Sequence, residues 1–189
     1  MTSTQRAYFE EMYRETADPW QFETSPYETR KYDITVASLP RTKYRSAFEP
    51  GCSIGVLSHL LAQRCQNVLA TDIIPLALER AAERLAASPN VRVEYRPIPE
   101  DWPAEQFDLI ILSEIGYYFA ESELERIVQL SIGSLDLGGH LVAVHWRGVT
   151  DYPLTGDRTH EVIDGMGTLR NVAHHLEVEF RLDIWERSA

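Results

Sequence analysis

The stretch AFEPGCSIG spans residues 47–55 and decides the fold of this 189-residue chain. Its short apolar run ends in the acidic Glu49, a loop with Gly51 and Gly55 follows, and a helix-forming run begins at Val56. This order is typical of a buried parallel strand that leads into a helix at a ligand crevice. Glycine has no Cβ, so Gly51 and Gly55 let a ligand lie against bare backbone, and the helix N-terminus beyond them offers unpaired N–H groups.

Strands and helices alternate downstream of this loop. The pattern predicts strands at 46–49, 68–72, 91–96, 107–113 and 140–146, and helices from 56, over 75–87 and over 122–135. Residues 107–113 are almost continuously apolar, as expected of a strand covered on both faces. Repeated β-α units predict a doubly wound parallel sheet with right-handed crossovers.

Two helices are expected before the first strand. The first covers about 6–16. The second begins at Pro26, with Ser25 as its N-cap and Glu28 completing a capping box, and it runs toward Leu39. These helices lie upstream of the alternating region and would form a cap on it.

The C-terminal region departs from the alternation. After a helix around 159–166, residues 169–175 fit a strand, with a helix as a nearly equal alternative, and the alternating run 180–185 predicts a last antiparallel strand. The predicted fold class is therefore α/β, with a Rossmann-like, doubly wound, mostly parallel seven-stranded sheet, an antiparallel last strand and N-terminal lid helices. We expect one domain, with cap helices at 1–45 and the core at 46–189.

Composition and charge exclude several functions. Lys and Arg number 18 against 29 Asp and Glu, which gives a formal net charge of −11. Nucleic-acid binding needs a basic footprint, so we expect a small-molecule partner and no nucleic acid. No apolar run is long enough to cross a membrane, and no signal-type N-terminus is seen. Cys52 and Cys65 cannot form a disulfide framework, so we expect a cytoplasmic protein. We also expect this protein to be a monomer or a weak homodimer.

The glycine loop suits more than one nucleotide-type cofactor. A dinucleotide site requires G-x-G-x-x-G, but those positions hold Gly51, Ser53 and Val56, so the fingerprint fails at two of three. A tight turn without any ligand is the simpler alternative. At the end of the second strand, Asp72 could accept hydrogen bonds from two ribose hydroxyls, or it could cap the helix that begins at Pro75.

Two further segments follow strand ends, where an open parallel sheet binds its ligand. Ile73 would place an apolar side chain against an adenine face. In the loop at 98–103, Asp101 could accept from the adenine amino group, with Trp102 packed nearby and Glu100 beside them. The alternative for this loop is an acidic surface turn.

Together these motifs resemble those of class I S-adenosylmethionine (SAM) methyltransferases over residues 47–146. EPGCSIG is similar to their E/D-x-G-x-G-x-G motif, with Ser53 in the middle glycine place, TDIIPLAL carries the ribose acid, and FDLIILSEIGYY is the strand-four motif. With DPWQFETSPYETRKY near the N-terminus, the chain resembles the subgroup that contains the rhizobial nodulation protein NodS. NodS-type enzymes N-methylate the free amine of a partly deacetylated chitooligosaccharide.

The resemblance implies SAM as the cofactor and S-adenosylhomocysteine as the product. It implies that Trp20 and Arg30 close over SAM, that Arg30 pairs with its carboxylate, and that the N-terminal helices act as a lid. The alternatives are a core aromatic for Trp20 and a solvated helix face for Arg30. The predicted cofactor-binding set is Trp20, Arg30, Glu49, Gly51, Cys52, Gly55, Asp72, Ile73, Glu100, Asp101, Trp102 and Ser113.

The reaction expected from this resemblance sets requirements for the substrate side. Methyl transfer from a sulfonium is an in-line displacement, so the enzyme must align nucleophile and methyl. An amine must be neutral to attack, so some group has to take its proton. The predicted catalytic candidates are Tyr118, His145 and Glu114, with Tyr117 and His160 also near this end of the sheet. Pocket walls are the alternative for the tyrosines, and a satisfied core histidine is the alternative for His145.

No set of side chains has metal-ligand spacing, so no metal site is expected. The leading prediction is a SAM-dependent N-methyltransferase that acts on an amino sugar or a similar small amine. Three alternatives stay open at this point: a small-molecule O-methyltransferase, a SAM-binding module without turnover, and a nicotinamide oxidoreductase, which the glycine spacing disfavours.

Overall fold

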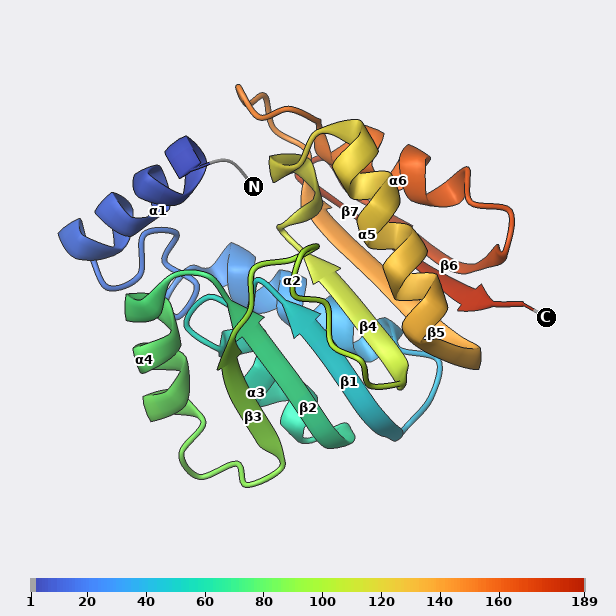
Figure 1. Ribbon diagram of the computed structural model, residues 1–189, viewed down its shortest axis with the longest axis horizontal. Coiled ribbons are helices and arrows are strands. Elements are labelled where there is room, and N and C mark those ends of the chain that lie inside the picture. The colour runs from blue at the N-terminus through green and yellow to red at the C-terminus, as the bar shows by residue number, and fades with distance from the viewer. Residues whose placement is uncertain (1–2, 189) are drawn as a thin grey trace.

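A seven-stranded sheet forms the centre of the computed structural model, which describes residues 3–188 (Figure 1). The strands are β1 (Tyr44–Pro50), β2 (Cys65–Asp72), β3 (Val91–Tyr95), β4 (Phe107–Ser113), β5 (Leu135–Trp146), β6 (Leu169–Leu176) and β7 (Phe180–Arg187). The helices are α1 (Ser3–Glu15), α2 (Pro26–Ser38), α3 (Val56–Ala62), α4 (Pro75–Arg84), α5 (Glu121–Ser134) and α6 (Gly156–Asp164), with a 3-10 turn, η1 (Gly116–Tyr118).

The strand order β3-β2-β1-β4-β5-β7-β6 gives the sheet a switch point in the middle. The strands from β3 to β5 are parallel, and β7 runs antiparallel to both β5 and β6. The chain moves outward from β1 to β2 and β3, then returns to β4 on the other side of β1. A crevice therefore opens beyond the carboxyl ends of β1 and β4. This arrangement confirms the predicted fold class.

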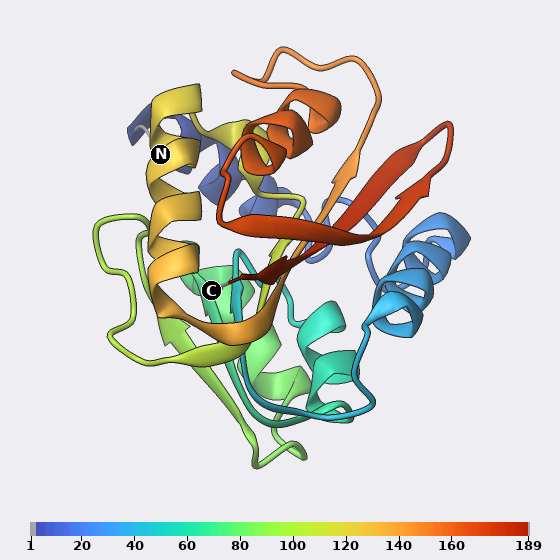
Figure 2. The same ribbon diagram turned by 90° about the vertical axis from the view of Figure 1, so that its right-hand side faces the viewer.

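Helices cover both faces of the sheet, as Figure 2 shows. Side chains alternate along a strand, so β4 contributes to both layers. Leu109 and Ile111 belong to one core cluster with residues of α2 and α3, whereas Ile110 and Leu112 belong to another with residues of α5 and α6. All four are fully buried, which explains the continuous apolar run in the sequence.

The start of α2 matches its sequence signals in part. Ser25 has extended backbone dihedrals, and its Oγ accepts a hydrogen bond from the backbone N–H of Glu28 at 3.4 Å. The reciprocal half of the predicted capping box is not made, because the Glu28 carboxylate pairs with the ammonium of Lys31 instead. A charged partner gives the stronger hydrogen bond, so the side chain of Glu28 turns inward.

One expectation in the C-terminal half of the chain changes, and the strand expected from residue 169 is confirmed. β5 begins at Leu135 rather than at His140, because Leu135 already pairs with Phe107 of β4. Residues 169–176 form a strand, since they pair antiparallel with β7. Among the described residues, no helix is both long and apolar enough to cross a bilayer.

Candidate active site

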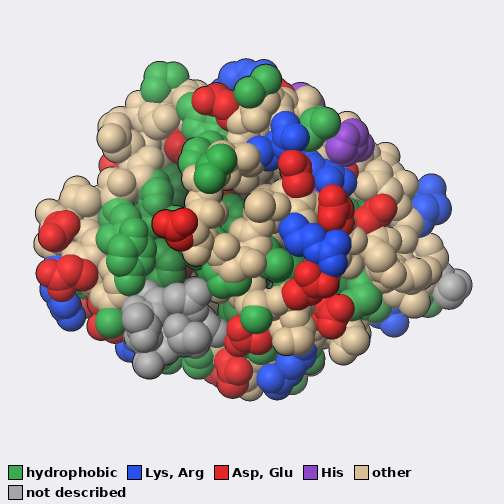
Figure 3. Space-filling model, turned by 90° about the horizontal axis from the view of Figure 1, so that it is seen from above, with side chains coloured by type: hydrophobic (Ala, Val, Ile, Leu, Met, Phe, Trp, Pro, Cys, Tyr) green, Lys and Arg blue, Asp and Glu red, His purple; other side chains and the backbone are tan. Residues whose placement is uncertain are grey.

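A cavity of about 590 Å³ lies at the carboxyl ends of β1, β2 and β4, with residues of α1 and α2 in its wall. Figure 3 views the molecule from this end, where hydrophobic side chains gather in a hollow. Eight predicted cofactor residues line it: Trp20, Glu49, Gly51, Cys52, Asp72, Ile73, Glu100 and Ser113. On the substrate side, Glu114, Tyr117 and Tyr118 also line it.

The glycine loop forms the floor of the cavity. Gly51 has φ +73°, and a Cβ built there would lie 2.6 Å from Cδ1 of Ile115. Ser53 adopts a φ of +51°, so the middle position of the motif keeps its left-handed backbone without glycine. Its side chain is hydrogen-bonded to the Tyr13 hydroxyl of α1 at 2.5 Å. Burial raises the pKa of the Cys52 thiol well above its ordinary value, which suits a packing role.

Asp72 is fixed beside this loop by backbone donors. Its Oδ1 accepts from the N–H groups of Ile73 at 2.7 Å and Ile74 at 3.0 Å, and its Oδ2 accepts from Ser53 at 2.9 Å. Burial raises the pKa of Asp72, and these three hydrogen bonds oppose that shift. A carboxylate oxygen can accept two hydrogen bonds, so Oδ2 keeps capacity for a ligand hydroxyl.

Glu49 is a second carboxylate at this end of the cavity, and it is almost fully buried. Its Oε2 accepts from the Ser58 hydroxyl at 2.6 Å. Burial raises its pKa to about 8, and among the described residues it has no ion-pair partner. A cation bound here would stabilise the ionised form of Glu49.

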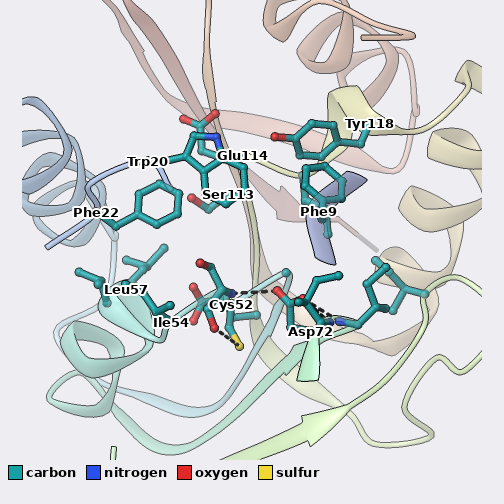
Figure 4. Close-up of a pocket in the computed structure, with 18 of the residues that line it drawn as sticks. Phe9, Trp20, Phe22, Cys52, Ile54, Leu57, Asp72, Ser113, Glu114 and Tyr118 are labelled. Atoms are coloured by element: carbon teal, nitrogen blue, oxygen red, sulfur yellow. Dashed lines mark hydrogen bonds between the residues drawn. The ribbon is translucent and has the colours of Figure 1, made fainter. Parts of the chain in front are cut away.

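Aromatic rings from the N-terminal segment cover the opposite wall (Figure 4). Phe9 of α1 lies 6.1 Å from the Trp20 ring and 4.9 Å from the Tyr118 ring, and Trp20 stacks on Phe22 at 5.5 Å. Tyr13 contacts Trp20 at 5.7 Å. The segment before β1 thus contributes much of the apolar surface that faces the cavity.

A buried charged cluster occupies the β4 end of the cavity. The Lys31 ammonium lies 2.5 Å from Oε1 of Glu114 and 2.9 Å from Oε2 of Glu28. Burial alone would lower the pKa of Lys31, but the two carboxylates outweigh it and raise the pKa. Both oxygens of Glu114 also accept from the Trp146 N–H at 3.1 Å, and the Tyr117 hydroxyl donates to Oε2.

His145, a predicted catalytic candidate, is buried behind the cavity and does not line it. Its Nε2 accepts from the Gly116 N–H at 3.0 Å, and its Nδ1 lies 3.0 Å from Nε2 of His160. Nδ1 of His160 lies 2.6 Å from Oδ2 of Asp183. Burial lowers the pKa of both histidines, so this row of neutral rings supports the η1 turn.

Arg30 does not reach the cavity, contrary to prediction. It is exposed and makes a bidentate ion pair with Glu177, at 2.7 and 2.8 Å. Successive residues of a helix point about 100° apart, so when Lys31 faces inward Arg30 faces solvent. Gly55 is also displaced from the predicted site: a Cβ there would meet Ala81 and Leu85 of the α3–α4 face, not a ligand.

Of the three residues predicted to contact the cofactor from the loop after β3, only Glu100 lines the cavity. Asp101 turns to Arg96, with its Oδ1 3.0 Å from the guanidinium. Trp102 packs edge-on against Phe48 and donates to the Ser134 hydroxyl at 3.1 Å. The partly buried indole packs against the core cluster and does not line the cavity.

The lining residues that sequence reasoning missed include Phe9, Tyr13, Glu28 and Lys31. The α2 pair had a usable signal. Residues 28, 31, 32 and 35 are spaced as one helix face, and all are buried. A charged pair at i and i+3 on an inward face indicates a buried ionic site. The described residues include no group of His, Cys, Asp or Glu arranged to hold a metal ion.

Comparison with known proteins identifies the family. The family model for nodulation protein S (NodS) matches residues 7–136, more than half of the chain. This chain belongs to the NodS family. The resemblance inferred from the sequence is therefore confirmed, and the matched residues include most of α1, all of α2 and the strands β1 to β4.

Individual relatives agree with the NodS assignment. Nodulation protein S of Rhizobium tropici is 29% identical over 127 residues, which cover 66% of this chain and 53% of the relative. That of Bradyrhizobium diazoefficiens USDA 110 is 32% identical over 109 residues, covering 55% of this chain and 50% of the relative. The chain spans about half the length of these curated relatives.

Solved structures extend the NodS comparison over the whole fold. A Pseudomonas syringae protein provisionally named a methyltransferase is 40% identical, with a TM-score of 0.77, and covers 85% of this chain and 99% of its own. The N-methyltransferase NodS of Bradyrhizobium japonicum WM9, solved with S-adenosyl-L-homocysteine, is 21% identical with a TM-score of 0.87. The match covers 97% of this chain and 99% of the NodS chain. At that identity the likeness shows the fold.

Proposed function

We propose that this chain is a SAM-dependent methyltransferase that transfers a methyl group to the amine of a small acceptor. The observation that carries the proposal is the pair formed by Asp72 and the Gly51 loop, which meet in one cavity whose far end holds a charged cluster. One half of the cavity suits an adenosyl group, and the other half suits a polar acceptor.

The residues at the β1 and β2 ends fit the cofactor. Oδ2 of Asp72 keeps a free acceptor position for a ribose hydroxyl, and Ile73 lines the cavity beside it. Gly51 lines the cavity, and its φ of +73° together with the close approach of Ile115 favours glycine at this place in the loop. The buried carboxylate of Glu49 suits the cationic amino acid end of the cofactor. SAM would supply an electrophilic methyl group on its sulfonium.

The charge at the β4 end supports an amine acceptor. Glu28 and Glu114 bring two carboxylates, against the single ammonium of Lys31. With both acids ionised, the cluster carries one net negative charge, which a protonated amine would balance. The B. japonicum relative is named an N-methyltransferase, and we propose an amino sugar or chitooligosaccharide-like amine as the acceptor here too.

Two measurements test this proposal. Calorimetry should show that S-adenosylhomocysteine binds and that NADH does not, and the reverse result would remove the methyltransferase assignment. Release of S-adenosylhomocysteine should then be followed with glucosamine oligomers that carry a free amine and with phenolic acceptors. Turnover of phenols alone would replace N-transfer by O-transfer, and binding without turnover of any acceptor would leave a SAM-binding module.

A further inference from the structure

Glu28 carries a buried carboxylate oxygen whose one partner among the described residues is the Lys31 ammonium. The residue is 8% exposed and lines the cavity from the first turn of α2. Lys31 donates to its Oε1 at 3.1 Å. Oε2 lies 2.9 Å from the same ammonium, yet it receives no hydrogen bond from any residue that the structure describes. A carboxylate oxygen can accept two hydrogen bonds, so Oε2 keeps an acceptor position for a donor on a ligand.

Glu114, the neighbouring carboxylate, has little capacity left. Its Oε1 accepts from Lys31 and from the Trp146 N–H, and its Oε2 accepts from Trp146 and from the Tyr117 hydroxyl. Of these two acids, Glu28 therefore has the oxygen available to a ligand.

The position of Glu28 places it on the acceptor side. Lys31 joins it to Glu114 at the end of β4, whereas Asp72 lies at the end of β2, on the other side of β1. A ligand whose sugar contacts Asp72 would extend across the switch point toward β4. Its reactive end would then approach the cluster of Glu28, Lys31 and Glu114.

We propose that Glu28 is the catalytic base of this site: its Oε2 binds the protonated acceptor amine and takes the proton before methyl transfer. This inference rests on the proposed function. An N–H bond of the acceptor ammonium breaks, and its proton goes to Oε2, which leaves a lone pair on nitrogen. The lone pair forms the N–C bond to the methyl group while the C–S bond breaks and its electrons stay on sulfur. The product is an N-methylammonium, and the proton on Glu28 leaves to solvent.

The surroundings of Glu28 favour proton exchange. Burial raises the pKa of Glu28, and the Lys31 ammonium opposes part of this rise. The pKa of Glu28 is therefore closer to that of an amine than the pKa of an exposed carboxyl group is, which favours proton transfer between them. The titratable groups that face it come from α2, from the connection before α2 and from the β4 end, and they are Tyr27, Lys31, Tyr32, Asp18 and Glu114.

Glu28→Gln tests the inference with little change in shape. The amide oxygen can still accept from Lys31, and Lys31 keeps Glu114 as its counter-ion. With a glucosamine oligomer bearing one free amine as acceptor, kcat should fall about 100-fold or more, the usual contribution of general base catalysis. The rise of kcat/KM with pH on the acidic side should vanish. In Glu28→Asp the carboxylate is kept on a side chain that is one methylene shorter. This variant should still show the rise of kcat/KM with pH, but with a lower kcat.

Controls separate this inference from the proposed function. S-adenosylhomocysteine affinity and thermal unfolding should stay near wild type in Glu28→Gln, and Glu125→Gln, an exposed position on α5, should leave kcat unchanged. Wild-type turnover of the amine together with near-normal kcat in Glu28→Gln would overturn the role of Glu28 alone. Glucosamine should also bind the S-adenosylhomocysteine complex about tenfold more weakly in Glu28→Gln, and equal binding would overturn the amine contact without any turnover measurement. Failure of wild type to bind S-adenosylhomocysteine would remove both proposals.

Discussion

Replacing Lys31 by Met would remove the ammonium that joins two buried carboxylates while keeping an unbranched apolar stem. The Lys31 side chain is 1% exposed, and its Nζ lies within 2.9 Å of Glu28 and 2.5 Å of Glu114. Removing one partner of a buried ion pair typically costs about 3–5 kcal/mol of unfolding free energy. For a chain of this size, each kcal/mol lowers Tm by about 2–4 °C, so we expect a fall of about 6–20 °C.

The pH dependence of this loss follows from the charges. The raised pKa of Lys31 means that its stabilising effect is fully present below the unfolded value of 10.5 and is lost only as pH rises through the folded value. Without Lys31, Glu28 and Glu114 face each other uncompensated. Protonation relieves that repulsion, so the difference in stability between Lys31→Met and wild type should narrow as pH falls from 7 toward 5.

Urea unfolding at several pH values measures this effect. Lys43 is the only other lysine, and it is exposed, so Lys43→Met is a matched control that should change stability little. Adding Glu28→Gln to Lys31→Met should recover part of the loss, because it removes one unpaired charge. A loss below about 1 kcal/mol, or one that is constant over this pH range, would refute the view that the cluster is a buried ionic unit.

Three further predictions address the cofactor end and the histidine row. Asp72→Ala should weaken S-adenosylhomocysteine binding in calorimetry by about 1–3 kcal/mol, the cost of unpaired hydrogen-bonding groups, and unchanged affinity would mean that the ribose lies elsewhere. Gly51→Ala should lower Tm and affinity together, because its Cβ would lie 2.6 Å from Ile115 at a φ of +73°; a variant indistinguishable from wild type would contradict the close packing. Burial alone would raise the pKa of Asp183, but hydrogen bonds from His160 and His174 hold this pKa well below the ordinary 3.8. Ionised Asp183 therefore stabilises the fold fully above pH 3.8, and this contribution is lost as pH falls through the folded pKa. Asp183→Asn should therefore cost about 2 kcal/mol near pH 7 in urea unfolding and less below about pH 4, and an equal cost at both would count against this account.

Fold and site location were predictable because both follow from chain order. Alternating β and α segments determine a parallel sheet with a switch point, and the switch point determines where strand ends converge. The acid at the end of β2 and the glycine loop after β1 therefore fell into one cavity, as predicted. Segment ends were less accurate, since β5 extends to Leu135 through pairing with Phe107 that no local pattern reveals.

Side-chain direction was harder to predict from the same sequence. Arg30 and Lys31 are adjacent cations, and only the helix phase of α2 decides that Lys31 enters the cavity. His145 lies at the carboxyl end of β5, as expected, but His160 and Asp183 come from distant elements and hold its ring away from the cavity. Such long-range partners carry no periodic signal in the sequence.

A crystal structure with S-adenosylhomocysteine tests the central claim most directly. It should show the ribose hydroxyls on Asp72, the backbone of the Gly51 loop against the ligand, and the sulfur directed toward Glu114 and Glu28. A cavity that stays empty at saturating ligand, or a ligand whose sugar avoids Asp72, would contradict the account.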